Sequence, residues 1–181
     1  MKKCLAIILS IIVIMSLVCS ASADIIDDLF YSNPWGKSKA EVEKEESTTQ
    51  KKESKAGKQA VVVTYKVKEY KLEKQYYFVE DKLVAAVFSV PFGSGREQEQ
   101  RLMIAIRNFD DSFGTGSVDI DKKLIAAQVN HCFDRYSIPH DKKISNYKKT
   151  NGLWQNATTI AVLVMDGKGN VKEYFFPAQD P

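Results

Sequence analysis

The chain has 181 residues, of which 44% are hydrophobic, and its 26 lysines and arginines nearly balance its 23 aspartates and glutamates. This length fits a single domain that is large enough to bury a substantial core. Nucleic-acid-binding proteins need a clustered excess of positive charge, which this balance does not provide, so we expect no nucleic-acid partner.

The first 23 residues have the features of an export signal. Lys2 and Lys3 form a positive start, Leu5–Val18 is an apolar run, and Ala21-Ser22-Ala23 supplies the small residues that a signal peptidase reads. We therefore predict cleavage after Ala23, which leaves residues 24–181 as the exported protein. Because the two lysines leave with the signal, 24 basic residues then face 23 acidic ones.

Two other fates of this N-terminus stay open. One is an uncleaved membrane anchor, although the apolar run is shorter than the roughly 20 residues that span a bilayer. The other is lipidation at Cys19, for which Ser16-Leu17-Val18 is a poor lipobox because Val18 is branched where a small residue is expected. We expect no stable membrane span after cleavage, and a location that is secreted, periplasmic or associated with the cell envelope.

Cysteine usage excludes an internal disulfide. Cys4 and Cys19 lie within the signal, so Cys132 is the one cysteine of the exported chain. The fold must then depend on its packed core. A single thiol of this kind is more often buried and inert than reactive.

Residues 24–58 are predicted to form an N-terminal segment that precedes an α+β domain at residues 59–181. Asn33-Pro34-Trp35-Gly36 has the composition of a turn. Ser38 precedes Glu41 by three residues, which is the capping-box spacing, so a short helix that packs on the domain should follow the turn. The remainder of the segment is charged and polar, which predicts a flexible connection.

Three strands are predicted in the β-rich centre of the chain. Val61–Lys68 alternates apolar and polar residues with the period of two that a half-buried strand shows. Lys71–Glu80 is rich in aromatic and β-branched side chains, and Leu83–Val90 follows after the polar pair Asp81-Lys82. Because the connections are too short for crossovers, we expect the strands to be antiparallel.

Two motifs carry a resemblance to a known group of domains. The first motif resembles the opening of the small exported BamE-like (SmpA/OmlA) lipoproteins and of the repeats of β-lactamase-inhibitor proteins. It reads Pro34-Trp35-Gly36-Lys37-Ser38-Lys39-Ala40-Glu41-Val42. The second motif resembles the β-hairpin of the same domains, and it reads Tyr76-Tyr77-Phe78-Val79-Glu80-Asp81-Lys82-Leu83-Val84. The resemblance covers about residues 34–90, and it implies a short helix packed on a three-stranded antiparallel sheet. It also implies binding rather than catalysis.

Two amphipathic helices are predicted after this centre. The first should end at Gly114-Thr115-Gly116-Ser117, which we interpret as a C-cap and joint because no P-loop lysine accompanies the glycines. The second should begin at Asp119, a good N-cap type, and stop before Pro139. Their apolar stripes are Leu102, Ile106, Phe109 and Phe113 in the first helix, and Leu124, Ile125, Val129, Cys132, Phe133 and Tyr136 in the second.

One group of residues has the composition of a catalytic set. A cysteine nucleophile needs a histidine base within hydrogen-bond reach and a third group that orients the base. Cys132 with His140 and Asp141 could supply these roles, and His131 and Asp134 lie nearby in sequence. The alternative is a buried thiol, a surface histidine and a charged loop, which we favour. The histidines lack the paired spacing of metal ligands, so we expect no metal and no cofactor.

The chain should close with a hairpin. Thr159–Met165 is strongly apolar, a glycine-rich turn follows, and Val171–Phe176 again has the composition of a strand. An isolated hairpin is marginal in water, so it should extend the earlier sheet. We therefore predict an α+β fold with a single antiparallel sheet of about five strands and with helices packed mainly on one face.

We predict an exported, non-catalytic binding domain whose partner is another protein or a component of the cell envelope. Aromatic side chains dominate binding energies, so an exposed sheet face would bind through Tyr65, Tyr70, Tyr76 and Tyr77 unless these are ordinary core residues. Two alternatives stay open. The first is a secreted cysteine-dependent hydrolase that uses Cys132 with His140, and the second is an inhibitor of a secreted enzyme.

Overall fold

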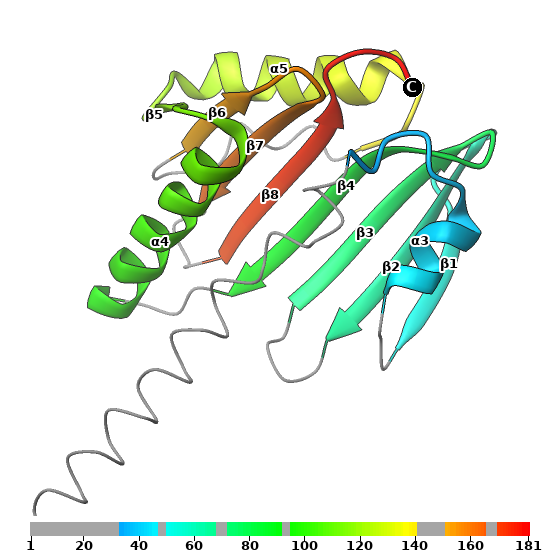
Figure 1. Ribbon diagram of the computed structural model, residues 1–181, viewed down its shortest axis with the longest axis horizontal. Coiled ribbons are helices and arrows are strands. Elements are labelled where there is room, and N and C mark those ends of the chain that lie inside the picture. Colours follow the sequence, from blue (N-terminus) through cyan, green and yellow to red (C-terminus); the bar gives the residue numbers. More distant parts are fainter. Residues whose placement is uncertain (1–32, 47–49, 68–71, 92–94, 141–150, 166–169) are drawn as a thin grey trace, which may run out of the picture.

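The computed structural model describes residues 33–46, 50–67, 72–91, 95–140, 151–165 and 170–181. Within these residues, eight strands form one antiparallel sheet in the order β1-β2-β3-β4-β8-β7-β6-β5, and three helices accompany it (Figure 1). The strands are β1 (Lys51–Lys55), β2 (Ala60–Val67), β3 (Leu72–Val79), β4 (Lys82–Pro91), β5 (Ser117–Val118), β6 (Asn151–Gln155), β7 (Thr159–Met165) and β8 (Asn170–Pro177). The helices are α3 (Lys39–Glu45), α4 (Gly95–Phe113) and α5 (Lys122–Arg135).

The centre of the sheet joins two parts of the chain that are far apart in sequence. β4 pairs with β8 in a register that sets Ala86 opposite Phe175 and Val90 opposite Val171. The closing hairpin of β7 and β8 therefore extends the sheet formed by β2, β3 and β4, as predicted. Most of the predicted turn between β7 and β8 lies outside the described residues. The predicted export signal, Tyr70 and Asp141 lie outside them entirely.

The prediction of about five strands was wrong, because the sheet has eight. The three additional strands lie at its two ends: β1 at one end, and β5 with β6 at the other. Each lacks the signal that reveals a strand in a sequence. β1 reads Lys-Lys-Glu-Ser-Lys with every residue exposed, β5 has two residues, and β6 begins in a stretch that looks like a loop. Charged or very short edge strands discourage the pairing of further chains.

The described helices cover both faces of the sheet, two on one face and one on the other. α3 and α4 pack on one face through Val42, Leu102, Phe109 and Phe113, and α5 packs on the opposite face through Ile125, Val129 and Phe133. The strands explain why. All seven residues of β7 are buried, so other elements must pack on both faces of this strand. In a strand with one exposed face, apolar residues would instead alternate with polar ones.

The helices match their predicted stripes with one exception. In α4, Leu102, Phe109 and Phe113 are buried, and Gly114 ends the helix with a φ of 85°, its N–H donating to the Asp110 carbonyl at 3.0 Å. In α5 the N-cap is Asp121 rather than Asp119, and the Leu124 side chain is 64% exposed.

The helical geometry of α5 explains the exposure of Leu124. Ala126 and Phe133 widen the buried stripe on one side, whereas Leu124 lies about 100° from Ile125 on the other side.

In the part of the chain that the structure describes, no helix is long and apolar enough to cross a membrane.

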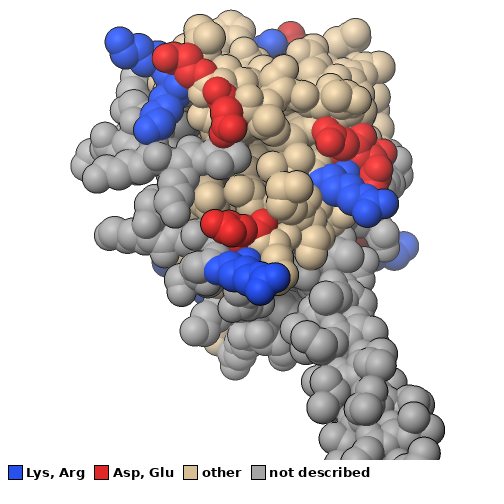
Figure 2. Space-filling view, turned by 90° about the vertical axis from the view of Figure 1, so that its left-hand side faces the viewer, with Lys and Arg blue, Asp and Glu red and all other residues tan. Residues whose placement is uncertain are grey.

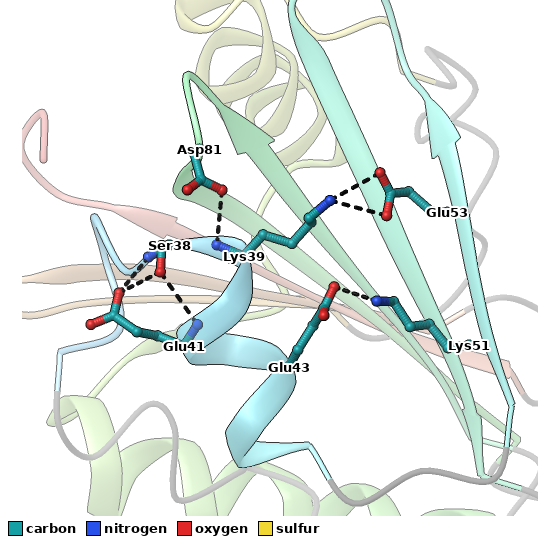
Figure 3. A network of polar contacts seen from close by, with 7 residues as sticks. All are labelled: Ser38, Lys39, Glu41, Glu43, Lys51, Glu53 and Asp81. Atoms are coloured by element: carbon teal, nitrogen blue, oxygen red, sulfur yellow. Dashed lines mark hydrogen bonds and ion pairs between the residues drawn. The ribbon is translucent and has the colours of Figure 1, made fainter.

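The N-terminal turn and α3 are fixed to the sheet by polar contacts (Figure 3). Ser38 and Glu41 form the predicted capping box, and the Lys39 backbone N–H donates to the Asp81 carboxylate at 3.1 Å. Lys39 Nζ on α3 lies 3.1 Å from the Glu53 carboxylate on β1. Lys51 on β1 forms a second ion pair, with Glu43 on α3. These exposed ion pairs are individually weak, but they connect α3 with the edge strand along its length.

Trp154 on β6 packs where two glycines leave room for its indole. A Cβ added at Gly116 would lie 2.2 Å from Trp154 Nε1, and one added at Gly152 would lie 2.3 Å from the far edge of the ring. The indole Nε1 donates to Asp110 Oδ1 at 2.7 Å, and the same oxygen accepts from the Gly116 N–H at 3.2 Å. One carboxylate of α4 thus fixes the ring and the loop that follows the helix.

Replacing Gly116 by alanine should destabilise the protein, because the new Cβ would displace the indole and break its hydrogen bond to Asp110. Overpacking of this kind costs about 1–3 kcal/mol of unfolding free energy. Urea unfolding measures the change, and Thr115→Ala at an exposed neighbouring position is the control. Equal unfolding midpoints for the two variants would contradict this packing.

Candidate functional site

Of the four tyrosines predicted to bind a partner, the three that the structure describes do not form an exposed face. Tyr65 is 2% exposed and Tyr76 is fully buried, both on the sheet face that α3 and α4 cover. Tyr77 is half-buried on the opposite face, where its ring centroid lies 5.5 Å from that of Phe133. Tyr70 lies outside the described residues. The three tyrosines that the structure places are therefore core aromatics.

A partly buried ion pair lies beside Tyr76. Lys74 Nζ is 3.1 Å from Glu46, just after α3, and the Tyr76 hydroxyl donates to the same carboxylate. Lys74 Nζ also lies 5.6 Å from the centre of the Phe88 ring, close enough for a cation–π contact. Such a desolvated pair contributes little net stability but fixes a unique arrangement, so we interpret it as part of how α3 docks on β3.

The structure does not bring Cys132 and His140 together as a catalytic pair. Cys132 is 2% exposed, and its Sγ accepts from the Gln128 side chain at 3.7 Å. The His140 ring stacks on Phe133 with centroids 4.8 Å apart, and its Nε2 lies 2.7 Å from Asn130 Oδ1. His131 and Asp134 are exposed.

The chemistry of Cys132 fits an inert thiol. Burial raises the pKa of its thiol from 9.0 to about 11, so the thiolate that would act as nucleophile is scarce at neutral pH. Within the described residues, no group of three or more His, Cys, Asp or Glu side chains is placed to hold a metal ion.

A thiol-specific maleimide should label Cys132 slowly in the folded protein at pH 8, since the thiol is buried and its pKa is raised. Mass spectrometry of the peptide that contains Cys132 measures the rate. The same reaction in denaturing urea is the control and should be fast. Labelling of the folded protein at the rate of the unfolded one would contradict the burial and would revive the cysteine hydrolase.

Glu173 on β8 is a buried acid that the sequence did not single out. It is 2% exposed and stands opposite Phe88 on β4 and Leu163 on β7, and its Oε2 has no hydrogen-bond partner among the described residues. Burial raises the pKa of this carboxyl from 4.5 to about 8, so the folded protein holds it protonated at neutral pH. The alternation in Val171, Glu173 and Phe175 is the sequence signal that it shares their buried face.

Glu173 should make the protein less stable as the pH rises. Because the pKa of Glu173 is raised in the folded protein, the unfolded chain releases this proton at a lower pH than the folded chain does. The contribution of Glu173 to the unfolding free energy is therefore complete below pH 4.5 and is lost as the pH rises through about 8. Over this window the unfolding free energy should fall by up to about 1.4 kcal/mol per pH unit on this account.

Urea unfolding at several pH values between 4.5 and 8 tests this dependence. The variant Glu173→Gln should lack this part of the slope, whereas Glu99→Gln, at an exposed position on α4, should keep it. The same slope in Glu173→Gln and in the unmodified protein would contradict the assignment.

A pocket of about 180 Å³ lies where three distant parts of the chain meet. The parts are the turn before α3, the turn between β6 and β7, and the residues after β8. Figure 1 shows the first described residues beside the C-terminal end of the chain. The pocket is lined by Asn33, Trp35, Ala157, Thr158, Gln179, Asp180 and Pro181. We call it the Trp35 pocket.

The Trp35 wall of the pocket is fixed by hydrogen bonds to the sheet. Trp35 Nε1 donates to the buried Thr159 Oγ1 at 2.9 Å. The turn closes with the Lys37 N–H donating to the Pro34 carbonyl at 3.2 Å, and Gly36 has the positive φ of 81° that this turn needs. The Gly36 N–H also donates to the Leu83 carbonyl at 3.1 Å. The turn is thereby anchored at the start of β4.

The other two walls are held in a similar way. Asn156 Oδ1 accepts from the backbone N–H groups of Thr158 at 2.9 Å and Thr159 at 2.8 Å, which shapes the turn between β6 and β7. The Ala178 N–H donates to the Thr158 carbonyl at 2.8 Å and thereby joins the third wall to the second. Asp180 Oδ1 accepts from the Tyr136 hydroxyl at 3.1 Å.

Charges near the pocket and elsewhere are mixed in sign. Arg135 on α5 lies 3.8 Å from Asp180, and no Lys or Arg side chain is among the residues that line the pocket. On the end of the molecule seen in Figure 2, basic and acidic side chains lie next to one another in small groups.

The Trp35 pocket could not be recognised in the sequence, because Asn33 and Trp35 lie more than a hundred positions before the other lining residues. One of its walls had a local signal, namely the turn composition of Asn33–Gly36. That signal does not indicate which distant segments meet the turn. Comparison of the chain with known protein families, with curated proteins and with solved structures gives no match.

Proposed function

We propose that this chain is an exported, non-catalytic binding domain that takes up a small component of the cell envelope in the Trp35 pocket. The pocket is the observation that carries the proposal. It combines a flat aromatic side chain with several polar ones, and its walls are fixed by hydrogen bonds before any ligand arrives. Preformed concave sites with a few convergent polar groups are the usual form of ligand-binding sites.

Three further features support binding rather than catalysis. The thiol of Cys132 is buried and weakly acidic, and His140 packs against Phe133. The N-terminal sequence has the features of an export signal, which supports a place outside the cytoplasm. The resemblance of residues 34–90 to BamE-like domains also supports a binding role, since that group implies binding.

The experiment uses protein secreted by the producing cell and observes its two tryptophan indole N–H signals by NMR. N-terminal sequencing should find Asp24 first if the signal is cleaved as proposed. A panel of neutral sugars, amino acids, choline and inorganic phosphate is then titrated. A pocket ligand should shift the signal of Trp35 but not that of Trp154, which lies buried against Gly116 and Gly152.

Trp154 therefore serves as an internal control within the same molecule. Equal shifts of both indoles would report a general change of the protein and would count against binding at this pocket. If no compound of the panel shifts the Trp35 signal selectively, the proposed function falls. A chain that is retained in the cytoplasm with residues 1–23 attached would contradict the proposed export.

A further inference from the structure

The buried acid Glu173 on β8 lies beneath the middle of α4. β4 ends at Pro91, which pairs with Asn170 at the start of β8, and α4 begins four residues later in the chain. Further along, the ring of Phe109 on α4 meets that of Phe175 on β8 with centroids 5.7 Å apart. The helix and the strand therefore run in the same direction (Figure 1). Between these two points the helix spans about 21 Å and the strand about 17 Å, which places the middle of the helix over Glu173.

The groups that face Glu173 across the sheet and from α4 are apolar. Glu173 stands opposite Phe88 and Leu163, and its Oε2 has no hydrogen-bond partner among the described residues. The buried residues by which α4 joins the same core cluster are Leu102, Ala105, Phe109 and Phe113. A protonated carboxyl can remain in such a place, whereas an unpaired carboxylate there is strongly disfavoured.

The charged groups that the structure places elsewhere on this face are already engaged. Lys74 on β3 stands in the same row beyond Phe88, and its Nζ lies 3.1 Å from the Glu46 carboxylate that follows α3. Asp110 on α4 accepts hydrogen bonds from an indole and from the loop after the helix. Burial accordingly raises the pKa of the Glu173 carboxyl to about 8, and no described cation faces it.

The two halves of α4 are held to the sheet unequally. Near its end, Asp110 accepts from the Trp154 indole at 2.7 Å, and the Phe109 ring packs on the same indole with centroids 4.9 Å apart. In the preceding turns the buried contacts are made by Leu102 and Ala105, each 8% exposed, which makes them the least buried members of this core cluster. The helix can therefore leave the sheet from its first half while its end stays attached.

We propose that Glu173 is a pH-sensitive latch for α4: when its carboxyl loses the proton, the first half of the helix, residues 95–105, opens away from the sheet. The proton passes to solvent, and water hydrates the carboxylate in the open form. Asp110 keeps the end of the helix attached to Trp154. Opening exposes the apolar sheet face around Phe88 and Phe175. This inference goes beyond the proposed function and does not depend on the Trp35 pocket.

Amide hydrogen exchange with short labelling times, followed by mass spectrometry, tests the latch on the exported protein. The unmodified protein is compared with Glu173→Gln at pH 6 and again at pH 8.5, because at a given pH both share the same intrinsic exchange rates. Between these pH values, exchange in residues 95–105 of the unmodified protein should accelerate relative to the variant by roughly ten- to a hundredfold. The reason is that the carboxyl ionises more readily in the open form than in the closed one.

Matched variants and a second readout complete the experiment. Glu99→Gln, at an exposed position on α4, should behave like the unmodified protein. Glu173→Met places an unbranched apolar side chain at the same position and should be as insensitive to pH as Glu173→Gln. A dye that fluoresces on apolar surfaces, such as anilinonaphthalene sulfonate, should bind more strongly at pH 8.5 than at pH 6 to the unmodified protein but not to the two Glu173 variants.

Three outcomes would overturn the latch. The first is an exchange ratio between the unmodified protein and Glu173→Gln that is the same at both pH values. The second is an equal acceleration in peptides of α5, since that would report unfolding of the whole domain rather than opening of one helix. The third is dye binding that does not change with pH. None of these outcomes bears on ligand binding at the Trp35 pocket, so the two proposals fail separately.

Discussion

The pairing of β4 with β8 is the interaction on which the rest of the structure depends. β4 belongs to the aromatic centre of the sequence and β8 to its end, yet they lie side by side in the middle of an eight-stranded sheet. All other strands extend outward from this pair. Forming it closes a loop of about eighty residues, an entropic cost that only the burial of both sheet faces can offset.

The Trp35 pocket is a consequence of that central pairing. Its Trp35 wall is bonded to Leu83 at the start of β4, and its third wall follows the end of β8. The turn between β6 and β7 completes it through Thr158 and Thr159. The three walls are placed relative to one another by their hydrogen bonds to the sheet and to each other.

Sequence reasoning succeeded where local patterns decide the structure. The alternation in β2, the apolar run of β7, the stripe of α4 and the capping box of Ser38 all report local geometry, and each was placed correctly. It failed for β1, whose five exposed polar residues carry no strand signal until β2 pairs with them. The pocket, the burial of Tyr65 and Tyr76, and the position of Glu173 depend on contacts between distant segments, which local patterns do not encode.

The two ends of the sheet bear on how this chain behaves at high concentration. An edge strand with free backbone groups is a template on which a second molecule can add and start an amyloid-like stack. Here one outermost strand has three lysines among its five residues, and the opposite one is only two residues long. A large antiparallel sheet that ends in this way can reach a high local concentration with little tendency to polymerise.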